Sequence, residues 1–482
     1  MAPTIFEKSR PGRRAVVLPA PARSGAPLAE LLGAKALRQT PPALPELSQL
    51  DLVRHYTELS RRNLGVDNAF YPLGSCTMKY NPRANEDVAA LEGLASTHPY
   101  QPPQTAQGLL EILWELAEAL RATTGLDAVC LQPAAGAHGE LACLMTARAF
   151  FRARGEERRI VAAPDTSHGT NPASAARAGF QVRTIPSDKR GRLDLGALAE
   201  ALGPEFGVLM ITNPNTLGLF EDQIAEAARR VHGAGGLVFM DGANLNAIVG
   251  KARPVDFGVD LMHINQHKTF STPHGGGGPG AGPIAAAGRL APFLPGPSIV
   301  RQAGRFALQP AGRESVGRVR AFFGNVAVLV RAWAYIRALG PEGLREASES
   351  AVLNANYLLA RLAPTYDIPY GPRCMHEFVL SAAKEAKAGA SAMDIAKKLL
   401  DCGFHPPTTY FPLIVKEALM IEPTESESPE TLDAFAQAML EIHRQIEQRP
   451  ESLRSAPETT DRSRFDEYQA ALKPVLRWRP DK

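Results

Sequence analysis

A lysine in the middle of the chain has the surroundings of a reactive amine. Lys268 follows a short apolar run at 261–264 and precedes a glycine-rich turn. A partly buried lysine is kept partly unprotonated and can form a Schiff base with an aldehyde. An isolated lysine on a loop is more often an exposed surface residue. Whether Lys268 is a reactive amine or an exposed surface residue therefore has to be judged from the residues around it.

Other polar residues follow short apolar runs in the same way; they are His168, the pair Thr212 and Asn213, and Asp241. If each apolar run is a parallel strand, its carboxyl end lies at the sheet edge where open α/β sheets bind their ligands. Asp241 and Lys268 are 27 positions apart, which leaves room for one crossover between adjacent strands. We therefore expect these side chains to converge at one edge.

The residue types at this edge match the needs of pyridoxal 5′-phosphate. Lys268 would hold the aldehyde as an imine, Asp241 would keep the pyridine nitrogen protonated, and the His168 ring would stack on the pyridine. The turn at 133–139 opens a helix, and a helix N-terminus with small residues is an anion site for the phosphate. Each residue alone has a commoner role, such as helix capping for Asp241. Only the combination predicts the cofactor.

Two other interpretations of the same stretch fail. A phosphate-binding P-loop has its lysine after the glycines, whereas Lys268 and Thr269 precede the glycines at 275–278. His263 and His267 stand four positions apart, as zinc ligands on a helix do. Their flanks indicate a strand followed by a loop, and no glutamate lies between them. No metal site is expected.

The elements that must position these residues alternate between strand and helix from about residue 125. Repeated β-α-β units predict an α/β fold with a mainly parallel, doubly wound sheet. After about residue 315 the pattern is helical, at 326–339 and 341–363, and a smaller α+β domain follows. The predicted strands cover 129–132, 160–163, 207–211, 237–240, 261–264 and 376–380, and further helices cover 48–64, 107–123, 225–233, 392–401 and 431–449.

The length of 482 residues predicts several domains. We expect an N-terminal arm and helical segment at 1–95, a large cofactor-binding domain at 96–335, and a small α+β domain at 336–482. Residues 1–50 are rich in proline clusters, which favours an extended arm. The final thirty or so residues are predicted to be a polar tail.

Composition excludes several classes of partner. With 53 basic and 50 acidic residues the formal net charge is +3, which gives no reason to expect nucleic acid or a membrane surface as a partner. No apolar run approaches the roughly 18 residues of a membrane helix. The five cysteines form no C-x-x-C pair, which favours a reducing compartment. We expect a cytoplasmic protein.

Eight long motifs identify a family. They are FYPLGSCTMKYNPR, LQPAAGAHGEL, DTSHGTNPASA, TNPNTLGLFE, MDGANLNAI, DLMHINQHKTFSTPHGGGGPG, GFHPPTTYFPLIV and MIEPTESES. Together they resemble the P-protein of the glycine cleavage system, in particular subunit 2 of its two-subunit form, and the resemblance spans nearly the whole chain. This enzyme is called glycine dehydrogenase (aminomethyl-transferring) or glycine decarboxylase. The opening FEKSRPGRRAVVLP also resembles the start of that subunit. The Arg-rich residues 9–24, which have the composition of a transit peptide, are therefore assigned to the mature chain.

The resemblance implies a fold type I pyridoxal-phosphate enzyme, similar to aspartate aminotransferase. In it Lys268 is the Schiff-base lysine, Asp241 the partner of the ring nitrogen, and His168 the ring that stacks on the cofactor. Ala135, Gly136 and Ala137 would approach the phosphate through backbone N–H groups. The remaining expected cofactor contacts are Thr212, Asn213 and Thr272, with Thr269 as a further hydroxyl.

The implied reaction is decarboxylation of glycine, with transfer of the aminomethyl group to the lipoyl arm of H-protein. Lys268 or His168 would move the proton, and candidates for glycine contact are His98, Asn213 and the turn at 404–407. A chain of this length implies a separate subunit 1 in an α2β2 assembly. The alternatives are another fold type I enzyme without a lipoyl partner, such as an amino acid decarboxylase or aldolase, and a cofactor-binding scaffold subunit.

Overall fold

The computed structural model describes residues 3–19, 25–40, 42–274 and 280–477, so the glycine run at 275–278 lies outside the described residues. The chain divides into two compact units. One comprises Gly65–Ala456, and the other combines Met1–Leu64 with Pro457–Lys482. The sequence does not indicate that the two ends of the chain belong to one unit. The predicted boundaries at 95/96 and 335/336 remain a prediction.

The larger unit contains a seven-stranded sheet in the order β1-β7-β6-β5-β4-β2-β3. Strands β3, β2, β4, β5 and β6 are parallel, and β7 runs antiparallel to both β6 and β1. The prediction of a mainly parallel sheet is therefore confirmed. The strands are β1 (Ala128–Cys130), β2 (Ile160–Pro164), β3 (Gln181–Ile185), β4 (Phe206–Thr212), β5 (Leu237–Gly242), β6 (Leu261–Ile264) and β7 (Ile284–Ala286).

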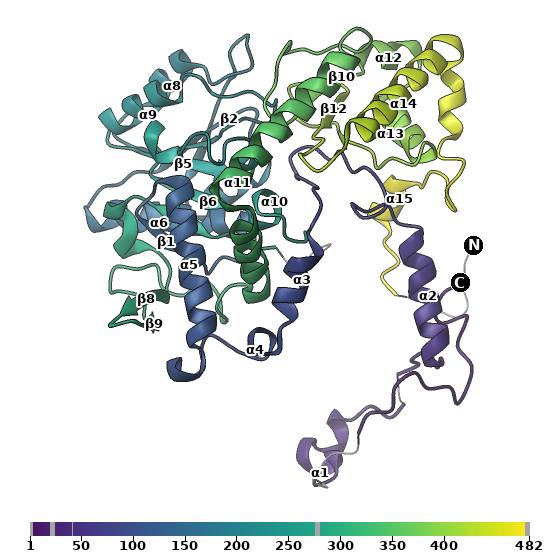
Figure 1. The fold of residues 1–482 in the computed structure, drawn as a ribbon, viewed down its shortest axis with the longest axis horizontal. Coiled ribbons are helices and arrows are strands. Elements are labelled where there is room, and N and C mark those ends of the chain that lie inside the picture. Colours follow the sequence, from purple (N-terminus) through teal and green to yellow (C-terminus); the bar gives the residue numbers. More distant parts are fainter. Residues whose placement is uncertain (1–2, 20–24, 41, 275–279, 478–482) are drawn as a thin grey trace. The chain divides into compact units, whose positions relative to one another are not determined.

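Alternate residues of the central strands face two hydrophobic layers. Leu209 and Ile211 of β4 pack in the layer formed with α5, α9 and α11, whereas Val208 and Met210 pack with α6 and α7. Strands β5 and β6 alternate in the same way, because successive side chains of a strand point to opposite faces. Helices thus cover both faces of the sheet, and Figure 1 shows α5 and α11 passing beside one another over it. The helices around the sheet are α3 (Arg83–Ala90), α4 (Glu92–Ala95), α5 (Gln107–Thr124), α6 (Gly136–Ala153), α7 (Thr170–Arg177), α8 (Leu195–Ala201), α9 (Ile224–Gly233), α10 (Gln266–Thr269) and the first part of α11 (Val326–Leu362).

The long element α11 contains a break where two separate helices are predicted. Gly340 has φ 64° and ψ −175°, which is not helical, and Pro341 follows it. Glycine adopts positive φ without steric cost, and proline lacks the N–H that would continue the helix across this point. The predicted helices at 326–339 and 341–363 correspond to the two sides of this break.

The segment after α11 forms a smaller α+β layer, as predicted. A three-stranded antiparallel sheet of order β10-β12-β11 packs with α13 and α14 around a separate hydrophobic core that includes Phe378, Leu419 and Phe435. Its elements are β10 (Phe378–Ser381), α12 (Ala383–Ala388), α13 (Ala392–Asp401), β11 (Thr408–Thr409), β12 (Ala418–Ile421) and α14 (Pro429–Gln448). A separate hairpin of β8 (Ser298–Gln302) and β9 (Arg305–Gln309) was not predicted.

The smaller unit consists of short helices joined by extended chain. Its main helix, α2, is capped by Ser48, whose side chain accepts the N–H of Asp51. Within this unit Arg62 pairs with Asp461 at 2.6 Å, which joins the N-terminal segment to the C-terminal one. The helices are α1 (Leu28–Leu32), α2 (Gln49–Arg61) and α15 (Glu467–Leu472).

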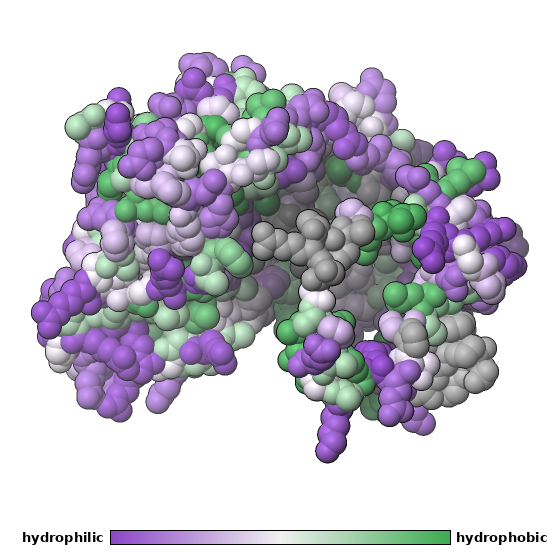
Figure 2. Space-filling model, turned by 90° about the horizontal axis from the view of Figure 1, so that it is seen from below, coloured by the Kyte–Doolittle hydropathy of each residue, from purple (hydrophilic) through white to green (hydrophobic). Residues whose placement is uncertain are grey.

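Within the described ranges, no helix has the length and apolar character required to cross a membrane. The most protruding side chains on the face shown in Figure 2 are hydrophilic, with hydrophobic residues scattered between them.

Candidate active site

A cavity of about 180 Å³ lies at the carboxyl ends of β4, β5 and β6, where the sequence predicts the site. Its walls come from three strand ends, from the N-terminus of α6, from the loop before α7 and from Ser75 of an N-terminal loop. Of the predicted residues, this cavity brings together Lys268, Asp241, His168, Thr212, Gly136 and Ala137. The complete lining is Ser75, Gly136, Ala137, Glu140, His168, Thr170, Thr212, Thr216, Asp241, Ala243, His263, Asn265, His267 and Lys268.

Lys268 lies in the single turn α10, directly beyond the end of β6. The turn is held at both ends: Gln266 N–H donates to the Ala281 carbonyl at 3.1 Å, and Lys79 Nζ donates to the Thr269 carbonyl at 2.8 Å. Lys268 itself is half-buried. The lysine therefore stands on a fixed turn with its amine at the cavity.

Asp241 ends β5 and is held from three directions. Asn171 Nδ2 donates to Oδ2 at 2.9 Å, the Ala243 N–H donates to Oδ1 at 2.9 Å, and His263 Nε2 lies 3.3 Å from Oδ1. Burial raises the pKa of Asp241, but the charge of His263, the Asn171 hydrogen bond and the charge of Lys268 together bring this pKa below its usual value. Asp241 is therefore ionised in the folded protein and suits a protonated ring nitrogen as its partner.

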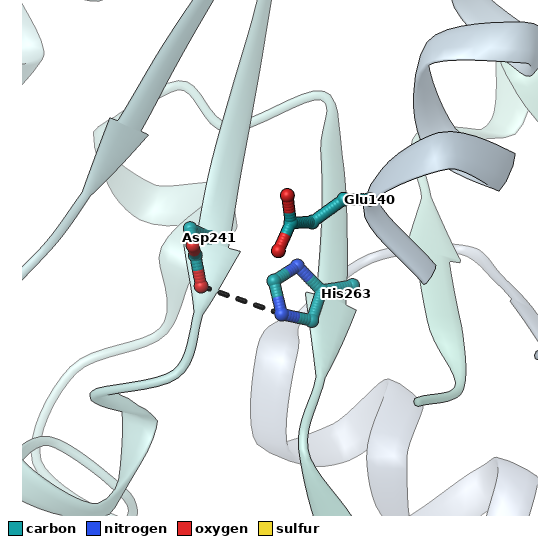
Figure 3. Close-up of side chains that lie close together, drawn as sticks. All are labelled: Glu140, Asp241 and His263. Atoms are coloured by element: carbon teal, nitrogen blue, oxygen red, sulfur yellow. Dashed lines mark ion pairs between the residues drawn. The ribbon is translucent and has the colours of Figure 1, made fainter. Parts of the chain in front are cut away.

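A second buried carboxylate lies behind Asp241. Glu140 of α6 accepts hydrogen bonds from Thr170 Oγ1 at 2.8 Å, from Asn171 Nδ2 at 3.1 Å and from Ser174 Oγ at 3.1 Å. In Figure 3 both carboxylates lie beside the His263 ring, with one ring nitrogen toward Asp241 and the other toward Glu140. Sequence reasoning missed Glu140 and considered His263 only as a zinc ligand. The register of β5 and β6 pairs His263 with Asp241 and so assigns it to the wall of the cavity.

His168 lies in the loop between β2 and α7, at the edge of the cavity. Its Nδ1 accepts the backbone N–H of Thr170 at 3.2 Å, and its ring is exposed to solvent. The ring meets Phe411 edge to face, with centroids 5.8 Å apart. An exposed ring on the cavity rim is accessible to a flat ligand.

The N-terminus of α6 forms a cradle for an anion. Gly136 and Ala137 open the helix and line the cavity, and Ala135 caps it. The first backbone N–H groups of a helix have no partner inside the helix. A Cβ on Gly136 would lie 2.5 Å from Asn265 Oδ1, so a larger residue there would displace the Asn265 side chain from the cavity wall.

Buried polar atoms at the cavity are available to a ligand. Thr212 Oγ1 and Asn265 Oδ1 are buried and have no hydrogen-bond partner among the described residues. Leaving such groups unpaired costs about 1–3 kcal/mol each, and a polar ligand in the cavity would satisfy them. A lysine, an ionised aspartate, a helix N-terminus and unpaired hydroxyl and amide oxygens together fit a phosphorylated aromatic aldehyde.

Several predicted contacts lie outside the cavity wall. Asn213 is buried, and its Oδ1 accepts the N–H of Glu221 at 3.0 Å. Thr269, the last residue of the lysine turn, and Thr272 just beyond it are both buried. The ring of His98 lies against Phe322. In the turn at 404–407, His405 stacks on Tyr71 with centroids 3.5 Å apart.

Two partly buried histidines beside the lysine are neutral near neutral pH. Burial, followed by the charges of His274 and Lys268, lowers the pKa of His267 to about 3. Burial and the charge of Lys268 lower the pKa of His274 to about 4. Near neutral pH, neither histidine therefore adds a positive charge next to Lys268.

A larger hollow of about 760 Å³ lies between α5 and α11. Its walls include Trp114, Trp333 and Leu344, and none of the residues at the strand ends lines it. Volume alone therefore does not locate the chemistry of this chain.

The chain is similar in sequence to known enzymes. The family described as "Glycine dehydrogenase, C-terminal domain" matches residues 347–460, and the family "Aminotransferase class-V" matches residues 138–362. A protein of Exiguobacterium sibiricum named "Probable glycine dehydrogenase (decarboxylating) subunit 2" is 54% identical over 99% of this chain and 97% of its own length. Its namesake from Desulforamulus reducens is 53% identical over 99% of both chains.

Solved structures share the fold. The chain matches a crystal structure of glycine decarboxylase (P-protein) of the glycine cleavage system with a TM-score of 0.74 and 24% identity, covering 86% of this chain and 94% of that one. A cysteine desulfurase from Escherichia coli matches with a TM-score of 0.60 and 18% identity, covering 78% and 96%. The predicted α/β aminotransferase-like fold is thereby confirmed.

Proposed function

Because the chain belongs to the family of glycine dehydrogenase (decarboxylating) subunit 2, we propose that it is the lysine-bearing chain of a pyridoxal-phosphate-dependent glycine decarboxylase. It is a fold type I enzyme, with glycine as its substrate. The observation that carries this proposal is the placement of Asp241 at the carboxyl end of β5 and of Lys268 just beyond the neighbouring parallel strand β6, around one cavity. A scaffold subunit would not need this arrangement.

The residues around the cavity suit the cofactor in distinct ways. Lys268 would hold the aldehyde, Asp241 the ring nitrogen, and His168 the ring face. The backbone N–H groups of Gly136 and Ala137 would hold the phosphate. Ala135 at the helix cap, Thr212 with its unpaired hydroxyl, and Asn213 and Thr272 farther out complete the proposed set. Pyridoxal 5′-phosphate, when bound, supplies an electron sink for the bond that breaks as carbon dioxide leaves.

The chain's own groups then have defined tasks. Asp241 stays ionised, because Asn171, Ala243 and His263 hold its two oxygens, and it would keep a proton on the ring nitrogen of the bound cofactor. Lys268 exchanges a proton at Nζ whenever its amine is free. His168 stands at the cavity rim, where it can cover the reacting centre and take or give a proton.

The assembly is part of the same proposal. The relatives' names number this chain as subunit 2, which supports a separate subunit 1 and, as the finer proposal, an α2β2 heterotetramer. The lipoyl arm of H-protein would receive the aminomethyl group. A cytoplasmic location is supported by the cysteines, all five of which are free in the described structure.

The test begins with the chain co-expressed with its subunit 1. We expect an absorbance band of the lysine–cofactor imine, and after borohydride reduction a pyridoxyl mass on Lys268. The K268A variant should lose both, whereas K251A, which alters an exposed lysine paired with Glu349, should keep both. A colourless protein with unmodified Lys268 after addition of cofactor would overturn the proposal.

A second assay separates this function from that of another fold type I enzyme. Exchange of carbon between bicarbonate and the glycine carboxyl should require lipoylated H-protein. Equal exchange without H-protein would favour an amino acid decarboxylase that acts without a lipoyl partner. An aldolase would show no exchange under either condition, because it does not break the bond to the carboxyl group.

A further inference from the structure

Two buried glutamates face each other at the edge of the small sheet. Phe378 of β10 pairs with Ile421 of β12 in antiparallel register. The next facing pair is Glu377 and Glu422, and both side chains have 0% exposed surface. Like charges directly opposite each other destabilise a sheet, and unpaired buried charges do so more strongly. A positively charged group between the two carboxylates would remove this destabilisation.

A buried histidine points at both glutamates without a hydrogen bond to either. His376 Nε2 lies 3.9 Å from Glu377 Oε1 and 3.9 Å from Glu422 Oε1, distances too long for hydrogen bonds. Within the described structure, both ring nitrogens of His376 and Oε1 of Glu422 have no hydrogen-bond partner. Of these atoms, His376 Nε2 and Glu422 Oε1 face each other, and Glu377 Oε1 lies at the same distance from Nε2.

The distances suit a small cation. Two of the separations between the three atoms are 3.9 Å and the third is at most 4.8 Å. The point equidistant from the three atoms is therefore about 2.0 to 2.5 Å from each, close to metal–ligand distances. A water oxygen needs hydrogen bonds of about 2.7 Å or more, and the absence of exposed surface on all three side chains leaves no water-sized space beside them. We propose that His376, Glu377 and Glu422 bind one divalent metal ion.

The surrounding contacts hold the two carboxylates as ligands. Ser75 N–H donates to Glu377 Oε2 at 2.7 Å, and Thr77 N–H donates to Glu422 Oε2 at 3.1 Å. These bonds leave Oε1 of each carboxylate directed at His376, although Glu377 Oε1 also accepts Asn244 Nδ2 at 3.1 Å. Hydrogen bonds to ligating carboxylates are usual around bound metals.

The charge state of the cluster suits a metal as well. Burial, followed by the charge of Lys268, lowers the pKa of His376 to about 3, so the ring is neutral, as a ligand must be. Burial raises the pKa of Glu422 to about 7, and burial together with Glu422 raises that of Glu377. The charge of Lys268 lowers the pKa of both carboxyl groups and so offsets burial only in part.

The ion would anchor the loop that carries Ser75 into the active-site cavity. Ser75 and Thr77 have φ of 65° and 41°, a region that residues other than glycine rarely adopt. Their N–H groups are held in this conformation by the two proposed carboxylate ligands. The proposed ligands are one imidazole nitrogen and two carboxylate oxygens. Such ligands favour Mn²⁺, Fe²⁺ or Zn²⁺ over a metal that prefers thiolate ligands.

The test measures metal directly, in the chain co-purified with its subunit 1 and freed of pyridoxal 5′-phosphate. After treatment with a chelator, the protein is titrated with Mn²⁺, and binding is measured as loss of the electron paramagnetic resonance signal of the free ion. In a separate titration with Zn²⁺, binding is measured by competition with a metal indicator. We expect one ion per copy of the chain and at least about a hundredfold weaker binding in E422Q and in H376Q. The control E385Q alters another buried glutamate beside a histidine, His443, and should bind as the unaltered chain does.

The outcomes are decisive whether or not the variants fold well. If the unaltered, folded chain binds neither ion, or if E422Q and H376Q bind as tightly as E385Q, the proposal is overturned and protons alone neutralise the two glutamates. The measurement needs neither cofactor nor glycine. Its failure therefore leaves the proposed decarboxylase function untouched, and the failure of that function leaves the metal site untouched.

Discussion

His263 Nε2 lies 3.3 Å from Asp241 Oδ1, and the two residues are register partners on the adjacent parallel strands β5 and β6. The side chains are 1% and 4% exposed. Neither side chain has room to turn away, so the imidazole fixes the orientation of the carboxylate that faces the cavity. Asp241 is thus a site residue whose geometry depends on a neighbour that lies behind it.

Replacing His263 with phenylalanine should weaken the binding of pyridoxal 5′-phosphate by about tenfold or more. The variant leaves the buried Asp241 without one of its partners, a loss of about 1–3 kcal/mol. Equilibrium dialysis with the cofactor measures the change. H232F is the matched control, because His232 pairs with Asp260 at 2.8 Å and does not line the cavity. Equal affinities in the two variants would show that His263 does not support the cofactor site.

Replacing Lys79 with methionine should lower the free energy of unfolding by about 3–5 kcal/mol. Lys79 Nζ is 2.7 Å from Glu425 Oε1 and also donates to Asn246 Oδ1 and the Thr269 carbonyl. Its side chain is 3% exposed and that of Glu425 13%, so the change leaves a largely buried carboxylate unpaired. Urea denaturation measures the difference.

The control for Lys79 is R83M in the same unit. Arg83 pairs with Asp67 at 2.7 Å, but both side chains are more than half exposed. Exposed ion pairs contribute about 0–1 kcal/mol, so R83M should unfold nearly as the unaltered chain does. If K79M lowers the free energy of unfolding no more than R83M does, the buried pair of Lys79 and Glu425 does not stabilise this part of the fold.

Replacing Gly282 with alanine should destabilise the protein by about 1–3 kcal/mol and weaken cofactor binding. A Cβ at this position would lie 2.1 Å from the Ala135 carbonyl oxygen, a backbone atom that cannot move without shifting the start of α6. Thermal unfolding and cofactor titration measure the two effects. G233A is the control, since a Cβ there meets nothing within 4 Å. Unchanged cofactor affinity in G282A would show that the start of α6 does not bind the phosphate of the cofactor.

Stability should fall as the pH drops below about 6.5, in part because of His267 and His274. Their folded-state pKa values, about 3 and about 4, lie below the usual histidine value of 6.5, since burial and Lys268 oppose protonation. At pH values between the folded-state pKa and 6.5, the unfolded chain binds more protons than the folded one. Each histidine therefore lowers the free energy of unfolding by about 1.4 kcal/mol for every unit by which the pH falls in this range. The groups facing them are Lys268 and His263, with the Ala281 N–H bonded to His267.

The double variant H267N/H274N tests this pH dependence. Urea denaturation at about pH 7 and about pH 5.5 should show a smaller loss of stability on acidification in the variant than in the unaltered chain. The partly exposed His443, which pairs with Glu385, provides the control variant H443N. An unchanged slope in the double variant would assign the acid sensitivity to other groups.

Much of the fold could be predicted where local sequence decides structure. Strand β6 begins and ends where its apolar run does, and α13 covers the predicted residues 392–401, since Ser391 caps it and its apolar residues recur at the helical period. Strand β3 was missed because four of its five side chains are exposed and show no buried face. Strand β7 was missed because three small apolar residues do not indicate a strand or its antiparallel direction.

The sequence by itself determined which residues stand at the strand ends, and therefore that Lys268, Asp241, Thr212 and His168 meet at one cavity, because carboxyl ends of parallel strands share an edge. Only the tertiary structure decided what surrounds them. His263 faces Asp241 through strand register, and Lys79 reaches the Thr269 carbonyl from 190 positions away. Glu377 meets Glu422 just outside the paired residues of β10 and β12. Such contacts depend on how separate elements pack, and no local pattern of apolar residues specifies them.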